Sequence, residues 1–160
     1  MAIWRRFVIA LGVVIPSLFF PLVAETATTG QYYWCDVRTG YAMGGFDPVA
    51  YFVDKKPRVG KTEFEYDWQN VTWRFVSAAN RAVFVRDPKV YAPQFGGYGA
   101  EATAKGVLTE GSPTVWLIYR DRLYLFAGAS QRMVWVDGPK FRRSKAVSNW
   151  DVLSKSLVRD

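Results

Sequence analysis

The chain of 160 residues contains no histidine and a single cysteine, Cys35. The lack of imidazole excludes a histidine general base, a histidine-ligated haem and most zinc or copper sites that proteins build. A single thiol also excludes a disulfide within the chain and a metal site made of several thiolates. Any chemistry must therefore come from carboxylates, hydroxyls, amines and aromatic rings.

Cys35 stands between Trp34 and Asp36, with no second thiol or imidazole to act with it. An isolated cysteine of this kind is typically a buried apolar side chain. Pairing with a thiol of another molecule, or a metal contact shared with another subunit, stays open as the alternative.

The N-terminus has the three parts of an export signal. Arg5 and Arg6 form a basic start, residues 7–23 carry no charge, and small residues such as Ala24 and Ala27 follow. This order predicts that residues 1–24 are a signal peptide or a retained membrane anchor, since the apolar run is close to the ~20 residues that span a bilayer. The polar residues 25–33 are predicted to be a linker.

Export sets the expected location of the remaining domain, residues 34–160. We expect it on the periplasmic or other extracytoplasmic side, held in the inner membrane by residues 7–24 if that helix is not cleaved. The membrane is then one partner of the chain. No nucleic-acid partner is expected, because an exported domain does not normally meet nucleic acid.

The formal net charge is +7, and basic residues gather near the C-terminus. Arg142, Arg143 and Lys145 lie in this cluster, which has few acidic neighbours. The ordinary use of such a cluster is the solvated face of a helix. The alternative is a surface that binds anionic lipid headgroups or an acidic partner.

Two pairs of segments alternate apolar and polar residues with a period of two, as half-buried strands do. Residues 64–68 and 71–75 form the first pair, and residues 115–119 and 123–126 form the second. Each pair surrounds a short polar turn. The spacing predicts two β-hairpins.

Helices are predicted from caps and periodicity. Ser77 is placed to cap a helix that runs to Val85 and ends before Asp87-Pro88. Further helices are expected at residues 100–105, 131–136 and 142–157, the last with Val147 and Trp150 in an apolar stripe.

The order of these elements predicts the fold class. The short apolar run from Val49 to Val53 predicts a buried strand. Because strands and helices are interspersed without regular alternation, we expect an α+β domain, a small antiparallel β-sheet built from hairpins with helices packed on it.

Acidic residues are the first candidates for chemistry. Glu63, Glu65 and Asp67 alternate along one predicted strand, so their carboxylates would share a face and offer oxygen ligands to a cation. Solvated strand faces show the same pattern by default. Asp47 precedes Pro48, where an Asp side chain usually fixes a turn by hydrogen bonding to the backbone that follows.

Aromatic residues near the glycine run offer a second candidate site. Tyr91, Phe95 and Tyr98, with Trp73, are able to line a pocket for a flat or lipid-like ligand. The ordinary use of such residues is the aromatic core.

The stretch from Gly45 to Gly106 resembles the core of YHS-domain proteins. The resemblance is carried by Asp47-Pro48-Val49-Ala50, Phe75-Val76-Ser77 and Gly96-Gly97-Tyr98-Gly99-Ala100. In such proteins cysteines tend to occupy the positions of Ala50, Val76 and Gly99. The resemblance implies a YHS-like fold for residues 34–160 and a metal-binding ancestor, while the replaced thiols put metal binding of that type in doubt here.

From these features we expect a non-catalytic exported domain without a cofactor. Its expected role is an accessory or interaction subunit, with a protein partner at a membrane complex or the cell envelope. One alternative is a metal-binding or metal-sensing envelope protein that uses Asp47, Glu63, Glu65, Asp67 and Cys35. The other is a binder of a small apolar or lipid-like ligand.

Overall fold

The computed structural model describes residues 31–157. The predicted signal or anchor, residues 1–24, and residues 25–30 of the predicted linker lie outside the described residues. Tyr33, at the end of that linker, is 9% exposed and belongs to the core, so the packed domain includes it.

Both predicted hairpins are confirmed. Strand β1 (Lys61–Trp68) pairs antiparallel with β2 (Val71–Phe75), and β3 (Ser112–Tyr119) pairs antiparallel with β4 (Arg122–Phe126). The two-residue turns have positive φ angles, 54° and 56° at Gln69-Asn70. Such angles match the right-handed twist of hairpin strands, and Asn tolerates them well.

The hairpins form two separate two-stranded sheets, not the single sheet that we expected. Another segment forms an isolated bridge to one strand of each sheet. Tyr41 forms a parallel bridge with Thr72 on β2, and Gly99 forms one with Leu125 on β4. An edge whose backbone groups are already paired has no donors or acceptors left for another strand.

Helices follow each hairpin, which confirms the α+β class. Helix α2 (Ala78–Arg86) starts at Ser77, whose Oγ accepts a hydrogen bond from the Asn80 amide at 3.1 Å, as predicted. It is followed by α3 (Pro88–Tyr91), α4 (Ala100–Ala104), α5 (Ala129–Val136) and α6 (Pro139–Leu153). Short 3₁₀ turns lie at Met43–Gly45, Gln94–Gly97 and Ser154–Ser156.

The predicted strand at Val49 to Val53 is wrong, because this segment forms the short helix α1 (Ala50–Val53). Asp47 Oδ1 accepts hydrogen bonds from the amides of Val49 at 2.8 Å and Ala50 at 3.3 Å. These bonds satisfy the first donors of a helical turn. The apolar run alone does not distinguish a buried strand from a buried helix.

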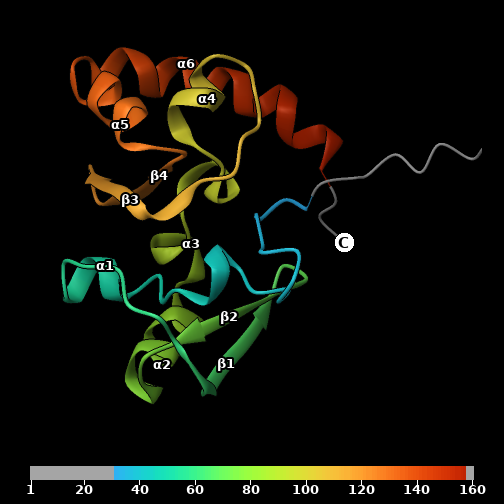
Figure 1. The fold of residues 1–160 in the computed structure, drawn as a ribbon. Helices are drawn as coiled ribbons and strands as arrows, with labels where there is room; N and C mark the ends of the chain where they lie inside the picture. The colour runs from blue at the N-terminus through green and yellow to red at the C-terminus, as the bar shows by residue number, and fades with distance from the viewer. Residues whose placement is uncertain (1–30, 158–160) are drawn as a thin grey trace, which may run out of the picture.

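The molecule has two aromatic cores, and β1–β2 and β3–β4 lie in different halves of the ribbon (Figure 1). The first half, with β1, β2, α1 and α2, packs around Trp73, Phe75 and Phe84. The second half, with β3, β4, α4, α5 and α6, packs around Tyr124 and Trp135, while Leu123 and Leu125 on the other face of β4 belong to the first core. Helix α3 lies between the halves in this view.

The helices are short, and no helix between residues 31 and 157 is both long and apolar enough to cross a bilayer.

Asp47 is expected to be essential for the first half. It is fully buried, and its second oxygen, Oδ2, accepts from the Val76 amide at 2.9 Å and from Asn80 Nδ2 at 2.7 Å. Asp47→Ala leaves four donors without their buried acceptor, so it should lower the free energy of unfolding by about 3 kcal/mol or more. Urea denaturation measures this change.

Asp54→Ala is the matched control, since Asp54 is exposed and pairs only with Arg58 at 3.2 Å among the described residues. Its cost should stay within about 0.5 kcal/mol. Equal losses for the two variants would contradict the role assigned to Asp47.

Candidate functional site

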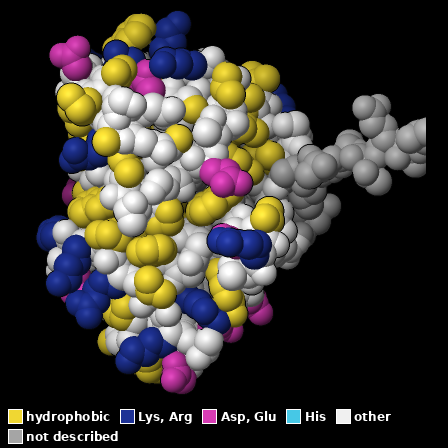
Figure 2. Space-filling model, viewed as in Figure 1, with side chains coloured by type: hydrophobic (Ala, Val, Ile, Leu, Met, Phe, Trp, Pro, Cys, Tyr) yellow, Lys and Arg dark blue, Asp and Glu magenta, His cyan; other side chains and the backbone are white. Residues whose placement is uncertain are grey.

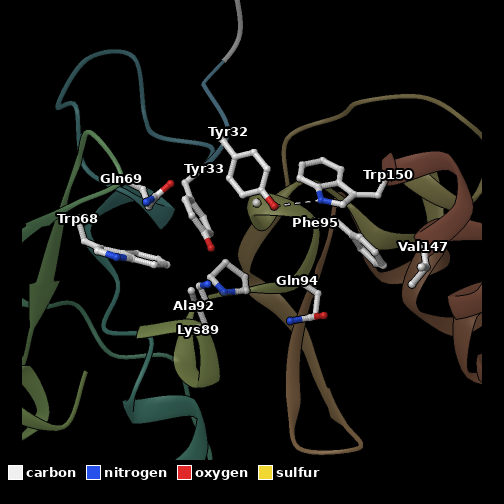
Figure 3. A pocket seen from close by; sticks show the side chains of 12 residues that line it. Tyr32, Tyr33, Trp68, Gln69, Lys89, Ala92, Gln94, Phe95, Val147 and Trp150 are labelled. Carbon is white, nitrogen blue, oxygen red and sulfur yellow. Dashed lines mark hydrogen bonds between the residues drawn. The ribbon is translucent and has the colours of Figure 1, made fainter. Parts of the chain in front are cut away.

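A cleft of about 530 Å³ opens where the two halves meet. We name it the aromatic cleft, because five aromatic side chains line it: Tyr32, Tyr33, Trp68, Phe95 and Trp150. Figure 3 shows Trp68 on one side and Trp150 with Phe95 on the other, with both tyrosines between them. The cleft thus draws on both ends of the sequence.

Separate parts of the chain position these rings. Trp68 ends β1, Phe95 lies in the 3₁₀ turn at Gln94–Gly97, and Trp150 projects from α6. Trp150 Nε1 donates a hydrogen bond to Tyr32 Oη at 3.3 Å, drawn as the dashed line in Figure 3. This bond connects residues 118 positions apart in the sequence.

The rings form a continuous series of edge and tilted contacts. Centroid distances are 5.1 Å for Trp68–Tyr33, 5.1 Å for Tyr33–Tyr32 and 5.3 Å for Tyr32–Trp150. Phe95 continues the series at 6.0 Å from Trp150. Aromatic pairs prefer such geometries, and each is worth about 0.5–1.5 kcal/mol beyond its buried area. The wall of the cleft is therefore held in place before any ligand arrives.

Polar and apolar surface line the cleft in nearly equal amounts. Besides the two tyrosine hydroxyls, the polar side chains among its described lining residues are Gln69, Lys89 and Gln94, and Lys89 alone carries a full charge. Lys89 is exposed. Aromatic walls with polar groups between them can bind the face of a ring and fix its orientation.

The floor of the cleft depends on Gly96, whose φ is +61°. Its carbonyl accepts a hydrogen bond from the Trp34 amide at 2.7 Å, and a Cβ at this position would overlap the Tyr32 carbonyl oxygen. The neighbouring Phe95 adopts φ of 55°, a left-handed conformation that is uncommon for a bulky residue. Such backbone strain is often found at ligand-binding sites.

The predicted aromatic pocket is thus placed differently from what we expected. Phe95 lines the cleft, and Tyr98 lies beside it with its ring 6.1 Å from Trp150. Tyr91 instead packs against Phe52 at 5.3 Å, and Trp73 is fully buried in the first core.

Sequence reasoning missed four of the five aromatic lining residues: Tyr32, Tyr33, Trp68 and Trp150. The available signal was the aromatic run Tyr32-Tyr33-Trp34 at the end of a polar segment, where a linker would not place large apolar side chains. Trp150 was assigned to an apolar stripe with Val147, but Val147 is 39% exposed and also borders the cleft.

The acidic candidates come together only in part, since Glu65 and Asp67 line one pocket beside Thr72 and each is already hydrogen-bonded. Glu65 Oε1 accepts from Arg74 Nε at 2.8 Å, and Asp67 Oδ1 accepts from Thr72 Oγ1 at 2.6 Å. A register shift between Lys61 and Glu65 interrupts the alternation that would have placed Glu63 on the same face. Within residues 31–157, no group of three or more His, Cys, Asp or Glu side chains is arranged to hold a metal ion.

Asp47 lies apart from the strand carboxylates and accepts four hydrogen bonds, as described above. Two of its donors are the amides of Ala50 and Val76, so it joins two of the positions where the resemblance implies cysteine. Gly99, the third such position, lies in the second half beside Ala127.

Cys35 is half-buried, and its Sγ donates to Gln31 Oε1 at 2.7 Å. Partial burial and the nearby Asp36 carboxylate raise the pKa of the thiol. A thiol with a raised pKa is a poor nucleophile and a poor metal ligand at neutral pH.

The basic candidates turn partly inward. Arg143 Nε donates to Tyr124 Oη at 3.1 Å, and Arg142 Nη1 pairs with Glu101 at 2.9 Å. Lys145 is exposed and lies 5.8 Å from the Phe141 ring. The ordinary solvated face predicted for this helix therefore applies only to some of its cations.

Comparisons of the chain with protein-family models, with curated proteins and with solved structures found no match. The resemblance to YHS-domain proteins stays a prediction from the motifs of the sequence.

Gly96→Ala is expected to destabilise the protein by about 2–4 kcal/mol, because the new methyl group overlaps the Tyr32 backbone and forces the N-terminal segment out of the cleft. Denaturant unfolding followed by tryptophan fluorescence measures this. Gly44→Ala is the control, since Gly44 has the same φ of +61° and nothing within 4 Å. It should lose only the ~1 kcal/mol of left-handed strain, and an equal loss would refute the overlap.

The buried tyrosines predict a loss of stability at alkaline pH. Burial, followed by the charge of Tyr32, raises the pKa of Tyr33, and burial with Asp47 raises that of Tyr51. The pKa of each tyrosine in the folded state lies above the ordinary value of 10.0. Above pH 10 the unfolded chain therefore loses the phenol proton more readily than the folded chain, and the free energy of unfolding falls; below pH 10 it is unaffected. Each such tyrosine contributes a slope of up to about 1.4 kcal/mol per pH unit.

Unfolding free energies measured between about pH 8 and about pH 11.5 test this prediction. This range brackets the ordinary tyrosine pKa of about 10. Tyr33→Phe should have a shallower slope above pH 10 than the natural chain. Parallel curves would show that Tyr33 ionises equally in both states.

Proposed function

We propose that this protein is a non-catalytic binding domain of the cell envelope whose aromatic cleft holds a small, flat and largely apolar ligand. The observation that carries the proposal is the meeting of five aromatic side chains from both halves around one cleft of about 530 Å³. Small-molecule sites typically have volumes of about 300–1,000 Å³ and are found where structural units meet.

The shape of the lining favours a ring system. The rings lie edge-on or tilted to one another, with interplanar angles of 75° and 63° for the two contacts of Tyr32. A flat ligand between Trp68 and Trp150 would make offset or edge contacts of the same kind. Gln69 near Trp68, with Gln94 and Lys89 on another side of the cleft, would bind polar groups of the ligand (Figure 3).

The lining side chains suit binding better than proton transfer. A general base works best with a pKa near the working pH. Tyr33 has a raised pKa and therefore keeps its proton at neutral pH. The proposal accordingly assigns the rings to contact and the few polar groups to orientation.

Attachment to the envelope rests on the predicted export segment. The role as an accessory subunit of a membrane complex also stays a prediction, because the described residues carry no observation of a partner. A ligand-binding domain in the envelope could work alone or as an accessory subunit of a membrane complex.

The uncharged aromatic probe N-phenyl-1-naphthylamine, a naphthalene joined to a phenyl ring through an amine, tests the cleft. We expect its fluorescence to rise on binding to the full chain, with one molecule bound per protein and quenching of tryptophan emission. Val147→Phe should weaken binding by about tenfold or more, because the larger ring enters the cleft from an exposed position that does not support the core.

Val152→Phe is the matched control, since Val152 lies on the same helix, is 69% exposed and is outside the cleft. It should bind the probe like the natural chain. Failure of the probe to bind, or equal binding by both variants, would overturn the proposal. If the probe binds as expected, native mass spectrometry of protein purified from membranes would identify the natural ligand by its mass.

A further inference from the structure

A second pocket, of about 330 Å³, lies between α4 and α6. We name it the basic pocket. Its charged lining residues are Glu101 from α4 and Lys105, directly after α4, with Arg142 and Lys145 from α6. It shares no lining residue with the aromatic cleft. The α6 residues that line the aromatic cleft are Val147 and Trp150, whereas those that line the basic pocket are Phe141, Arg142, Lys145 and Asn149.

A buried carboxylate forms the base of this pocket. Glu101 is 1% exposed, and its Oε1 pairs with Arg142 Nη1 at 2.9 Å and Lys105 Nζ at 3.4 Å. Asn149 Nδ2 donates to the carbonyls of Thr103 and Ala104, both at 3.0 Å, and so fixes α6 against α4. The pocket is therefore built from two elements held at a defined separation.

Two polar atoms of this ion pair are buried without a hydrogen-bond partner among the described residues. They are Oε2 of Glu101, an acceptor, and Nε of Arg142, a donor. Buried polar atoms in native proteins are almost always paired, and each exception calls for an explanation. An unpaired acceptor and an unpaired donor, on two residues that both line the pocket, point to an external group that offers both kinds of hydrogen bond.

The charge of the pocket favours an anion. Three cations face one carboxylate among the described lining residues, and Lys145 makes no ion pair with any residue from 31 to 157. An anion without a proton would still place its oxygens against Oε2 of Glu101, with no donor between them. An anion that carries a hydroxyl avoids this repulsion by donating to the carboxylate.

We propose that the basic pocket binds a phosphate group that retains a P–OH hydroxyl, as inorganic phosphate or a phosphate monoester. The phosphate oxygens accept from Lys105, Lys145 and Arg142 Nε, and the P–OH donates to Glu101 Oε2. Phe141, 67% exposed at the rim, offers an apolar surface to the carbon part of an ester. Figure 2 shows basic and hydrophobic side chains together at the end of the molecule where α5 and α6 lie.

Isothermal titration of the full chain with inorganic phosphate, glycerol 3-phosphate and sulfate at pH 6 and constant ionic strength tests the proposal, since about half of a phosphate monoester keeps its P–OH at that pH. Sulfate has the same shape but no proton to donate at this pH. We expect phosphate or its ester to bind and sulfate to bind at least about tenfold more weakly. No binding of either phosphate compound, or equal affinity for phosphate and sulfate, would overturn the proposal.

Variants place the site. Lys145→Gln should weaken phosphate binding by about tenfold, because it removes an exposed cation without touching the core. Lys140→Gln is the control, as an exposed lysine of the same helix outside the pocket. Equal effects of the two variants would mean that binding follows net charge rather than this pocket.

Glu101→Gln tests the hydroxyl directly, because its amide donates to sulfate. The preference for phosphate over sulfate should disappear in this variant, and a preserved preference would overturn the role of Glu101. If the variant fails to fold, the sulfate comparison and Lys145→Gln still decide the proposal.

Vesicles distinguish the source of the phosphate. Sedimentation with vesicles that contain phosphatidic acid, competed by glycerol 3-phosphate, would assign it to a lipid headgroup. Binding of the soluble compounds without sedimentation would assign it to a soluble phosphate. Both results support the shared chemistry, and the tests are independent of the probe that measures the aromatic cleft.

Discussion

The two halves of the molecule meet through side-chain packing and not through a shared sheet. Leu123 and Leu125 of β4 belong to the first core, and single bridges from Tyr41 and Gly99 pair with β2 and β4 where another strand could have paired. Rings from distant segments, joined by the Trp150–Tyr32 hydrogen bond, fill part of the junction instead. Rings that pack edge to face leave irregular space between them, and the aromatic cleft is that space.

What the sequence predicted well was local. The hairpins follow from period-two patterns around two-residue turns, and the Ser77 cap follows from a single side chain. The segment at α1 was mistaken for a strand because a four-residue apolar run has no period of its own. Its helical state is set by Asp47, whose other donors, Val76 and Asn80, come from about thirty residues later in the chain.

The candidate sites depend on contacts between distant segments, and this is why the sequence identified them only in part. In the sequence, Asp47 and Glu65 are candidate metal ligands. In the structure, Asp47 accepts backbone hydrogen bonds and Glu65 forms an ion pair with Arg74. No sequence motif surrounds Glu101. Its burial follows from the packing of α4 against α6, which also brings Arg142 to it. Phe95 was predicted because the glycine run beside it was visible, whereas Tyr32 and Trp150 were separated by most of the chain.

Helix α6 borders both sites, so their independence depends on whether this helix has one position or two. Energetic coupling between sites requires an element with two arrangements that both ligands bias. Ala146 is fully buried near the middle of α6, Asn149 fixes one side to the α4 backbone, and Trp150 binds Tyr32 on another. Moving the helix would break all three contacts at once. The packing therefore favours two sites that fill separately, with α6 as a fixed wall between them.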